Sequence, residues 1–137
     1  MIPRTYLPAA ALALALLAPA TDAQAFNCAI PGLFSAAKKT VCASPTLAAL
    51  NRTETDRLAG LRARLGAEAM VAVNRDRRTF TATRDQCARD VRCHEATYTA
   101  QVRLYRRLDT CADRGKQVVF CVNRTILRHR EELHRSL

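Results

Sequence analysis

Apolar residues recur at intervals of three and four along most of the chain, the spacing of one face of an α-helix. Two such stripes follow each other, and Gly66 ends the first of them. Because only a tight turn separates the two helices, we expect them to lie antiparallel. The stripes consist of Leu47, Leu50, Glu54, Leu58, Leu61 and Leu65, and then of Met70, Val73, Arg77, Phe80, Arg84 and Cys87.

The remaining signals predict three more helices. A short helix over residues 35–43 precedes Ser44-Pro45, residue types preferred at an N-cap and at the first helical position. Asp90 is suited to be the N-cap of a helix that runs to about Ala112. A last helix starts at Gln117. Since the periodicity is helical nearly throughout, the predicted fold class is all-α, a small disulfide-stapled bundle of about four to five helices.

The last two predicted helices each have one apolar side. A helical wheel at about 100° per residue gathers seven residues on the buried side of the helix that starts at Asp90, namely Cys93, Tyr98, Val102, Leu104, Tyr105, Leu108 and Cys111. The last helix repeats apolar residues at helical spacing, at Val119, Val122, Ile126 and Leu133.

Charged residues interrupt the stripes of the antiparallel pair. Counting outward from Gly66 places Leu58 level with Arg77, so that Glu54 lies within one turn of Arg77. We predict a structural ion pair between Glu54 and Arg77. The alternative is that both side chains lie at the edge of the stripe and extend into solvent.

Residues 1–25 have the pattern of an export signal. Arg4 precedes an apolar run over residues 7–20, and Ala23-Gln24-Ala25 matches a small-x-small cleavage site. An uncleaved membrane anchor is the alternative, but the run is shorter than the ~20 residues needed to span a bilayer. We therefore expect a periplasmic or secreted protein without a transmembrane segment.

Six cysteines follow the predicted cleavage site, at Cys28, Cys42, Cys87, Cys93, Cys111 and Cys121. In an oxidising compartment an even number of cysteines indicates disulfides, here three. Six cysteines can be paired in about 15 different ways. The spacings favour the three local pairs, 28 with 42, 87 with 93 and 111 with 121. Zinc binding is the weaker alternative because no Cys-x-x-Cys occurs.

The chain is strongly basic, with 22 Lys and Arg residues against 12 Asp and Glu and a net charge of +10. Four arginines share an arc of about 100° opposite the buried side of the helix that starts at Asp90. They are a candidate binding stripe for anions, composed of Arg92, Arg103, Arg106 and Arg107. The alternative is that this row is only the solvated side of a helix.

Four stretches together resemble the LprI-like lysozyme-inhibitor N-terminal domain family. They are Phe26-Asn27-Cys28, Val41-Cys42-Ala43-Ser44-Pro45-x-Leu47-x-x-Leu50-Asn51, Phe80-x-x-x-Arg84-Asp85-x-Cys87 and Cys93-x-x-x-x-Tyr98. The resemblance implies small, exported, all-helical modules of bacterial envelopes and the pairings Cys28–Cys42 and Cys87–Cys93. It divides the chain into a helical domain over residues 26–110 and a helical extension with an extra disulfide over residues 111–137. Asn51, Glu54 and Phe80 depart from the residues common in the family.

Two functions follow as expectations. The resemblance implies a non-catalytic inhibitor whose partner is lysozyme or another envelope hydrolase, although two basic proteins repel each other at long range. The positive net charge of the chain favours a different function, the binding of an anionic envelope polymer or lipid headgroups through the arginine stripe. Nucleic acid is a poor candidate, since export separates the protein from it and exposed aromatics do not interleave the stripe.

We expect no enzymatic activity. The three histidines do not flank a serine or aspartate in a catalytic arrangement, and glycine-rich phosphate loops are absent from the sequence. His129 and His134 are expected to be exposed on the last helix. No catalytic residue, metal ligand or cofactor is therefore predicted.

Overall fold

The computed structural model describes Phe26, residues 28–29 and residues 34–136, so the predicted export signal over residues 1–25 lies outside the described part. Within that part the chain forms helices and no strand. The elements are α1 (Ala36–Ala43), α2 (Pro45–Gln86), α3 (Val91–Asp109), the 3₁₀ helix η2 (Ala112–Gln117) and α4 (Val118–Arg135). The molecule is a small, all-α bundle stapled by disulfides, as the helical periodicity and the cysteine spacing predict.

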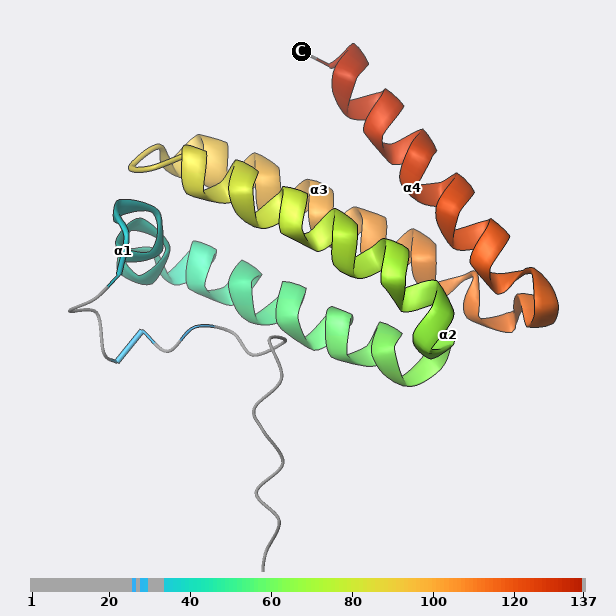
Figure 1. The fold of residues 1–137 in the computed structure, drawn as a ribbon. Helices are drawn as coiled ribbons and strands as arrows, with labels where there is room; N and C mark the ends of the chain where they lie inside the picture. Colours follow the sequence, from blue (N-terminus) through green and yellow to red (C-terminus); the bar gives the residue numbers. More distant parts are fainter. Residues whose placement is uncertain (1–25, 27, 30–33, 137) are drawn as a thin grey trace, which may run out of the picture.

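The element α2 is a hairpin of two long helical arms (Figure 1). Gly66 interrupts its helical backbone with φ 78° and ψ 164°, a conformation that only glycine adopts readily. The arms over residues 45–65 and 67–86 therefore fold back on each other, and the predicted antiparallel pair is confirmed. Ser44 caps the first arm by accepting a hydrogen bond from the Leu47 amide at 3.2 Å, and Pro45 follows as the first helical residue.

Asp90 caps α3 through a hydrogen bond from the Cys93 amide to its carboxylate at 3.0 Å. The helix ends at Asp109, three residues before the predicted Ala112. The chain then winds through η2, where Gly115 takes φ 54°, and reverses into α4. The tighter path brings Cys111 back to Cys121, and a straight continuation of α3 would not allow this.

Two apolar clusters fill the bundle. The larger lies toward the Gly66 turn and joins α2, α3 and α4 through residues such as Leu58, Leu104 and Ile126. The smaller lies at the α1 end and contains Val41, Leu47, Phe80 and Tyr98, with Phe26 and Leu50 packed against it. Segment 111–137 therefore shares the main core of the preceding helices. Leu133, which the spacing places on the buried side of α4, is 42% exposed because α4 runs past the end of that core.

All three local disulfides are present. They join Cys28 to Cys42, Cys87 to Cys93 and Cys111 to Cys121, with sequence separations of 14, 6 and 10. The first ties the N-terminal segment to α1, the second closes the α2–α3 loop, and the third closes the turn before α4. None of the described helices combines the length and the apolar character needed to cross a bilayer.

Candidate functional site

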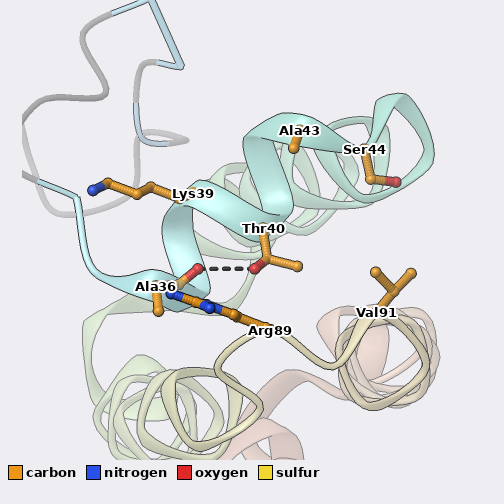
Figure 2. Close-up of a pocket in the computed structure, with 7 residues that line it drawn as sticks. All are labelled: Ala36, Lys39, Thr40, Ala43, Ser44, Arg89 and Val91. Carbon is orange, nitrogen blue, oxygen red and sulfur yellow. Dashed lines mark hydrogen bonds between the residues drawn. The ribbon is translucent and has the colours of Figure 1, made fainter.

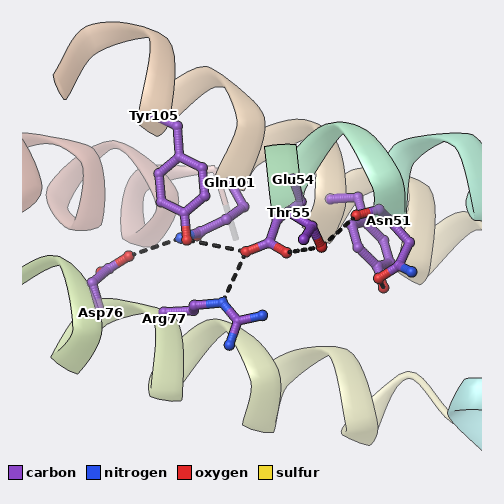
Figure 3. Close-up of polar contacts among 8 residues, drawn as sticks. Asn51, Glu54, Thr55, Asp76, Arg77, Gln101 and Tyr105 are labelled. Atoms are coloured by element: carbon purple, nitrogen blue, oxygen red, sulfur yellow. Dashed lines mark hydrogen bonds and ion pairs between the residues drawn. The ribbon is translucent and has the colours of Figure 1, made fainter. Parts of the chain in front are cut away.

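The predicted ion pair lies at the centre of a buried polar network (Figure 3). The Arg77 Nε donates to Glu54 Oε1 at 3.1 Å, and the Tyr105 hydroxyl donates to the same oxygen at 3.1 Å. The Glu54 side chain is 2% exposed and that of Arg77 20%. The ion pair is confirmed, and the alternative in which both side chains extend into solvent is wrong because Tyr105 of α3 covers the carboxylate.

A second carboxylate, that of Asp76, links α2, α3 and α4. Its Oδ2 accepts a hydrogen bond from the Gln101 side-chain Nε2 at 3.2 Å, and its Oδ1 accepts one from Arg130 Nε at 3.3 Å. Asp76 belongs to α2, Gln101 to α3 and Arg130 to α4. The sequence does not reveal this cluster, since nothing in a single helix shows which residues a crossing helix will cover.

These buried groups are fully engaged with one another. Tyr98 donates to the Asn51 side-chain oxygen at 3.2 Å, and the Thr55 hydroxyl donates to the Asn51 carbonyl at 3.0 Å. Burial raises the pKa of Tyr105 well above its ordinary value, and the Glu54 carboxylate adds to this rise. Through Arg77 of the second α2 arm and Tyr105 of α3, the Glu54 carboxylate links both arms of α2 to α3.

The residues that carry the family resemblance gather at the α1 end of the bundle. Phe80 packs edge-to-face on Tyr98 at 5.3 Å between ring centroids. The Arg84 guanidinium lies 5.4 Å from the centroid of the Phe26 ring and donates to Asp85 at 2.8 Å. Because these contacts are internal, the pattern describes how this end of the molecule packs.

The arginines of α3 divide into two groups. Arg92, Arg103 and Arg106 are exposed, and no ion pair engages them within the described residues. Arg107 is half-buried and donates to Glu132 of α4 at 2.7 Å. Of the four arginines in the candidate stripe, Arg107 is thus engaged by α4, which packs along that edge of α3. We use the name α3 arginine face for Arg92, Arg103 and Arg106.

Most acidic side chains are already partnered with arginines. Ion pairs in the described part of the chain join Glu54, Asp76, Asp85, Asp109, Asp113, Glu131 and Glu132 to arginines. Each of these seven acids therefore has a guanidinium group as its ion-pair partner. Many of the cations that give the chain its net charge of +10 are exposed arginines without an acidic partner in the described part, such as Arg92, Arg103 and Arg106.

An open hollow of about 500 Å³ lies between α1 and the disulfide-closed loop over residues 87–93 (Figure 2). Ala88 takes φ 47° in this loop, and its carbonyl lies 3.0 Å from the buried Nε2 of His94. Figure 2 shows the Arg89 side chain beneath α1 while Lys39 extends away from it. The two side chains do not converge on one point. They add positive charge to this end of the bundle but do not form a focused anion site.

His129 is buried, with 4% of its surface exposed, whereas His134 is exposed as expected. The expectation of exposure is wrong for His129 because α4 turns this side toward α2 and α3. Burial lowers the pKa of His129, with Arg107 and Arg103 adding to the effect and Asp76 and Glu132 opposing it.

The depressed pKa of His129 makes stability depend on pH. The folded state favours the neutral His129 ring. Its contribution to the free energy of unfolding is therefore fully present above the ordinary histidine pKa of about 6.5, and it decreases as the pH drops below that value. We expect urea unfolding to show a smaller loss between about pH 7.5 and pH 5 in His129→Gln than in the unchanged chain. His134→Gln, on the exposed side of the same helix, is the control and should keep the full loss. An identical loss in all three proteins would contradict the assignment.

Among the described residues, no three His, Cys, Asp or Glu side chains group closely enough to hold a metal ion. The cysteines are all joined in disulfides, so zinc has no thiolate ligands here. No family model, curated protein or solved structure matches this chain.

Proposed function

We propose that this chain is a non-catalytic binding protein of an oxidising compartment, periplasmic or extracellular, whose ligand is a linear anionic polymer held on the α3 arginine face. The observation that carries the proposal is the presence of three exposed arginines, free of ion pairs within the described residues, on one side of a rigid helix. A guanidinium binds phosphate or carboxylate through two parallel hydrogen bonds, which makes arginine well suited to such a ligand.

The spacing of the face suits an extended ligand. At about 1.5 Å per residue, Arg103 lies about 16 Å and Arg106 about 21 Å along the helix axis from Arg92. One small anion cannot contact all three residues, whereas a chain of repeating phosphates or carboxylates can. Rigid docking of α3 through Tyr98, Tyr105 and Leu108 holds these positions before the ligand arrives.

The disulfides support the proposed location. Three disulfides in a chain of this size are typical of proteins that function outside the reducing cytosol. The export-signal pattern of residues 1–25 points the same way. Free diffusion in a compartment that contains polyanionic surface polymers would bring the arginine face to its ligand.

Inhibition of lysozyme or another envelope hydrolase is supported only by the sequence resemblance. An inhibitor of a basic lysozyme needs an acidic contact surface, because like charges slow the encounter. In the described structure the acids are spread over the bundle and most are paired with arginines. The charge arrangement thus favours the polyanion as ligand.

A charge-matched pair of variants tests the proposal. The first removes the α3 arginine face by Arg92→Gln, Arg103→Gln and Arg106→Gln. The second removes three exposed arginines of α2 by Arg52→Gln, Arg75→Gln and Arg78→Gln, so the net charge falls equally from +10 to about +7 in both. With linear polyphosphate as the probe, we expect the α3 variant to bind at least about tenfold more weakly, which is about 1.4 kcal/mol. The α2 variant should lose clearly less.

Equal weakening of both variants would show that only net charge matters and would overturn the proposal. A lysozyme assay with the same proteins separates the competing function. Strong inhibition of lysozyme that persists in the α3 variant would support an inhibitor with a different contact surface.

A further inference from the structure

The outer side of α4 carries two large apolar residues in water. Phe120 is 65% exposed and Leu127 is 59% exposed. On a helical wheel the two lie about 20° apart and about 130° from the midpoint of Val122 and Ile126, which face the core. Packing against α2 and α3 therefore leaves them without a partner in the described molecule.

Two arginines stand beside these apolar residues. Arg124 and Arg128 lie four and eight residues after Phe120 and are exposed, and no ion pair engages either within the described chain. The exposed pair of Arg135 and Glu131 follows on the same side near the end of the helix. We use the name α4 outer face for Phe120, Arg124, Leu127 and Arg128.

We propose that the α4 outer face docks on the surface of an anionic lipid bilayer. Exposed apolar side chains next to arginines are typical of an interfacial helix, because the apolar groups enter the acyl boundary while the guanidinium groups remain among the headgroup phosphates. This binding surface is separate from the α3 arginine face and does not depend on it.

Charge complementarity selects this occupant over a second copy of the chain. A symmetric dimer through the same face would gather Arg124 and Arg128 of both copies in one interface, and the acid on this side, Glu131, is already paired with Arg135. A bilayer with acidic headgroups instead offers negative charge directly above a hydrocarbon layer. The helix is already held by its packing on α2 and α3 and by the Cys111–Cys121 disulfide, so docking requires no folding of α4.

The chain contains no tryptophan, so a single introduced indole reports on its own surroundings. We would compare Phe120→Trp with Val91→Trp, since Val91 is 43% exposed and starts α3 at the far end from the η2 turn. The probe is a vesicle of phosphatidylglycerol and phosphatidylcholine, with and without brominated acyl chains. We expect a blue shift and quenching by the bromines for Phe120→Trp only. Unchanged emission at position 120, or an equal response at position 91, would overturn the proposal.

A second measurement separates the apolar contribution from net charge. Phe120→Gln with Leu127→Gln leaves the charge unchanged and is expected to reduce co-sedimentation with the anionic vesicles at least about fivefold. Val71→Gln, which replaces a residue 58% exposed on α2, is the control and should sediment like the unchanged chain. Equal binding of the double variant and the control would contradict the proposal.

The outcomes also separate this inference from the proposed function. The Phe120 and Leu127 variant should retain its affinity for linear polyphosphate, because the α3 arginine face is intact. Loss of polyphosphate binding without loss of vesicle binding in the α3 variant would leave both proposals standing. Strong binding of the unchanged chain to vesicles of phosphatidylcholine alone would contradict the role assigned to Arg124 and Arg128.

Discussion

Reduction of the three disulfides is expected to unfold the protein at physiological temperature. Closure of loops with separations of 14, 6 and 10 residues removes conformational freedom from the unfolded chain. The entropic model assigns about 2–3 kcal/mol to each loop, on the order of 8 kcal/mol together. Domains of this size have a total stability of about 5–15 kcal/mol. The disulfides therefore account for a large share of the free energy of unfolding.

Thermal unfolding followed by circular dichroism, with and without a reductant, measures this effect. We expect a cooperative transition in the oxidised protein and little residual helix in the reduced protein at about 37 °C. Replacing only Cys111 and Cys121 by alanine is the graded comparison and should lower stability by about 2–3 kcal/mol. Equal melting temperatures in oxidised and reduced protein would show that packing alone suffices.

Loss of the Glu54 carboxylate is expected to be the most damaging single substitution. Glu54→Ala removes the acceptor of Arg77 Nε and of the Tyr105 hydroxyl, which lie at the interface of the α2 arms and α3. Breaking one side of a buried pair typically costs about 3–5 kcal/mol, and here the buried Tyr105 hydroxyl also loses its acceptor. Urea unfolding should show a loss in this range.

Two further variants show whether the loss comes from this network. Glu95→Ala removes an exposed acid of α3 and should change stability by less than about 0.5 kcal/mol. Glu54→Leu combined with Arg77→Leu replaces the pair by apolar groups and should recover much of the loss, since such replacements are often neutral. A loss for Glu54→Ala no larger than for Glu95→Ala would contradict the buried network.

The sequence alone predicted the parts of the fold that depend on neighbouring residues. Ser44 and Asp90 cap helices as expected, and Gly66 turns the hairpin because its backbone conformation excludes most side chains. The Glu54–Arg77 pair could be predicted because the tight turn fixes the register of the two arms. The caps and the turn depend on residues close in the sequence, and the register of the ion pair follows from the turn at Gly66.

The position of α4 was beyond such signals. The burial of His129, the Arg130 contact to Asp76 and the engagement of Arg107 by Glu132 all depend on where α4 crosses α2 and α3. A wheel gives the apolar side of a helix but not its crossing point on a neighbour. The sequence could therefore not show that Glu132 of α4 engages Arg107, one of the four arginines of the candidate stripe.

The salt dependence of polyphosphate binding tests the α3 arginine face most directly. Each contact with a flexible polyanion contributes about 0.7 to the slope of log affinity against log salt, through counterion release. We predict that replacing Arg92, Arg103 and Arg106 by glutamine lowers this slope by about 2, while the charge-matched α2 variant keeps nearly the slope of the unchanged chain. Identical slopes in the unchanged chain and the α3 variant would show that these arginines do not touch the ligand.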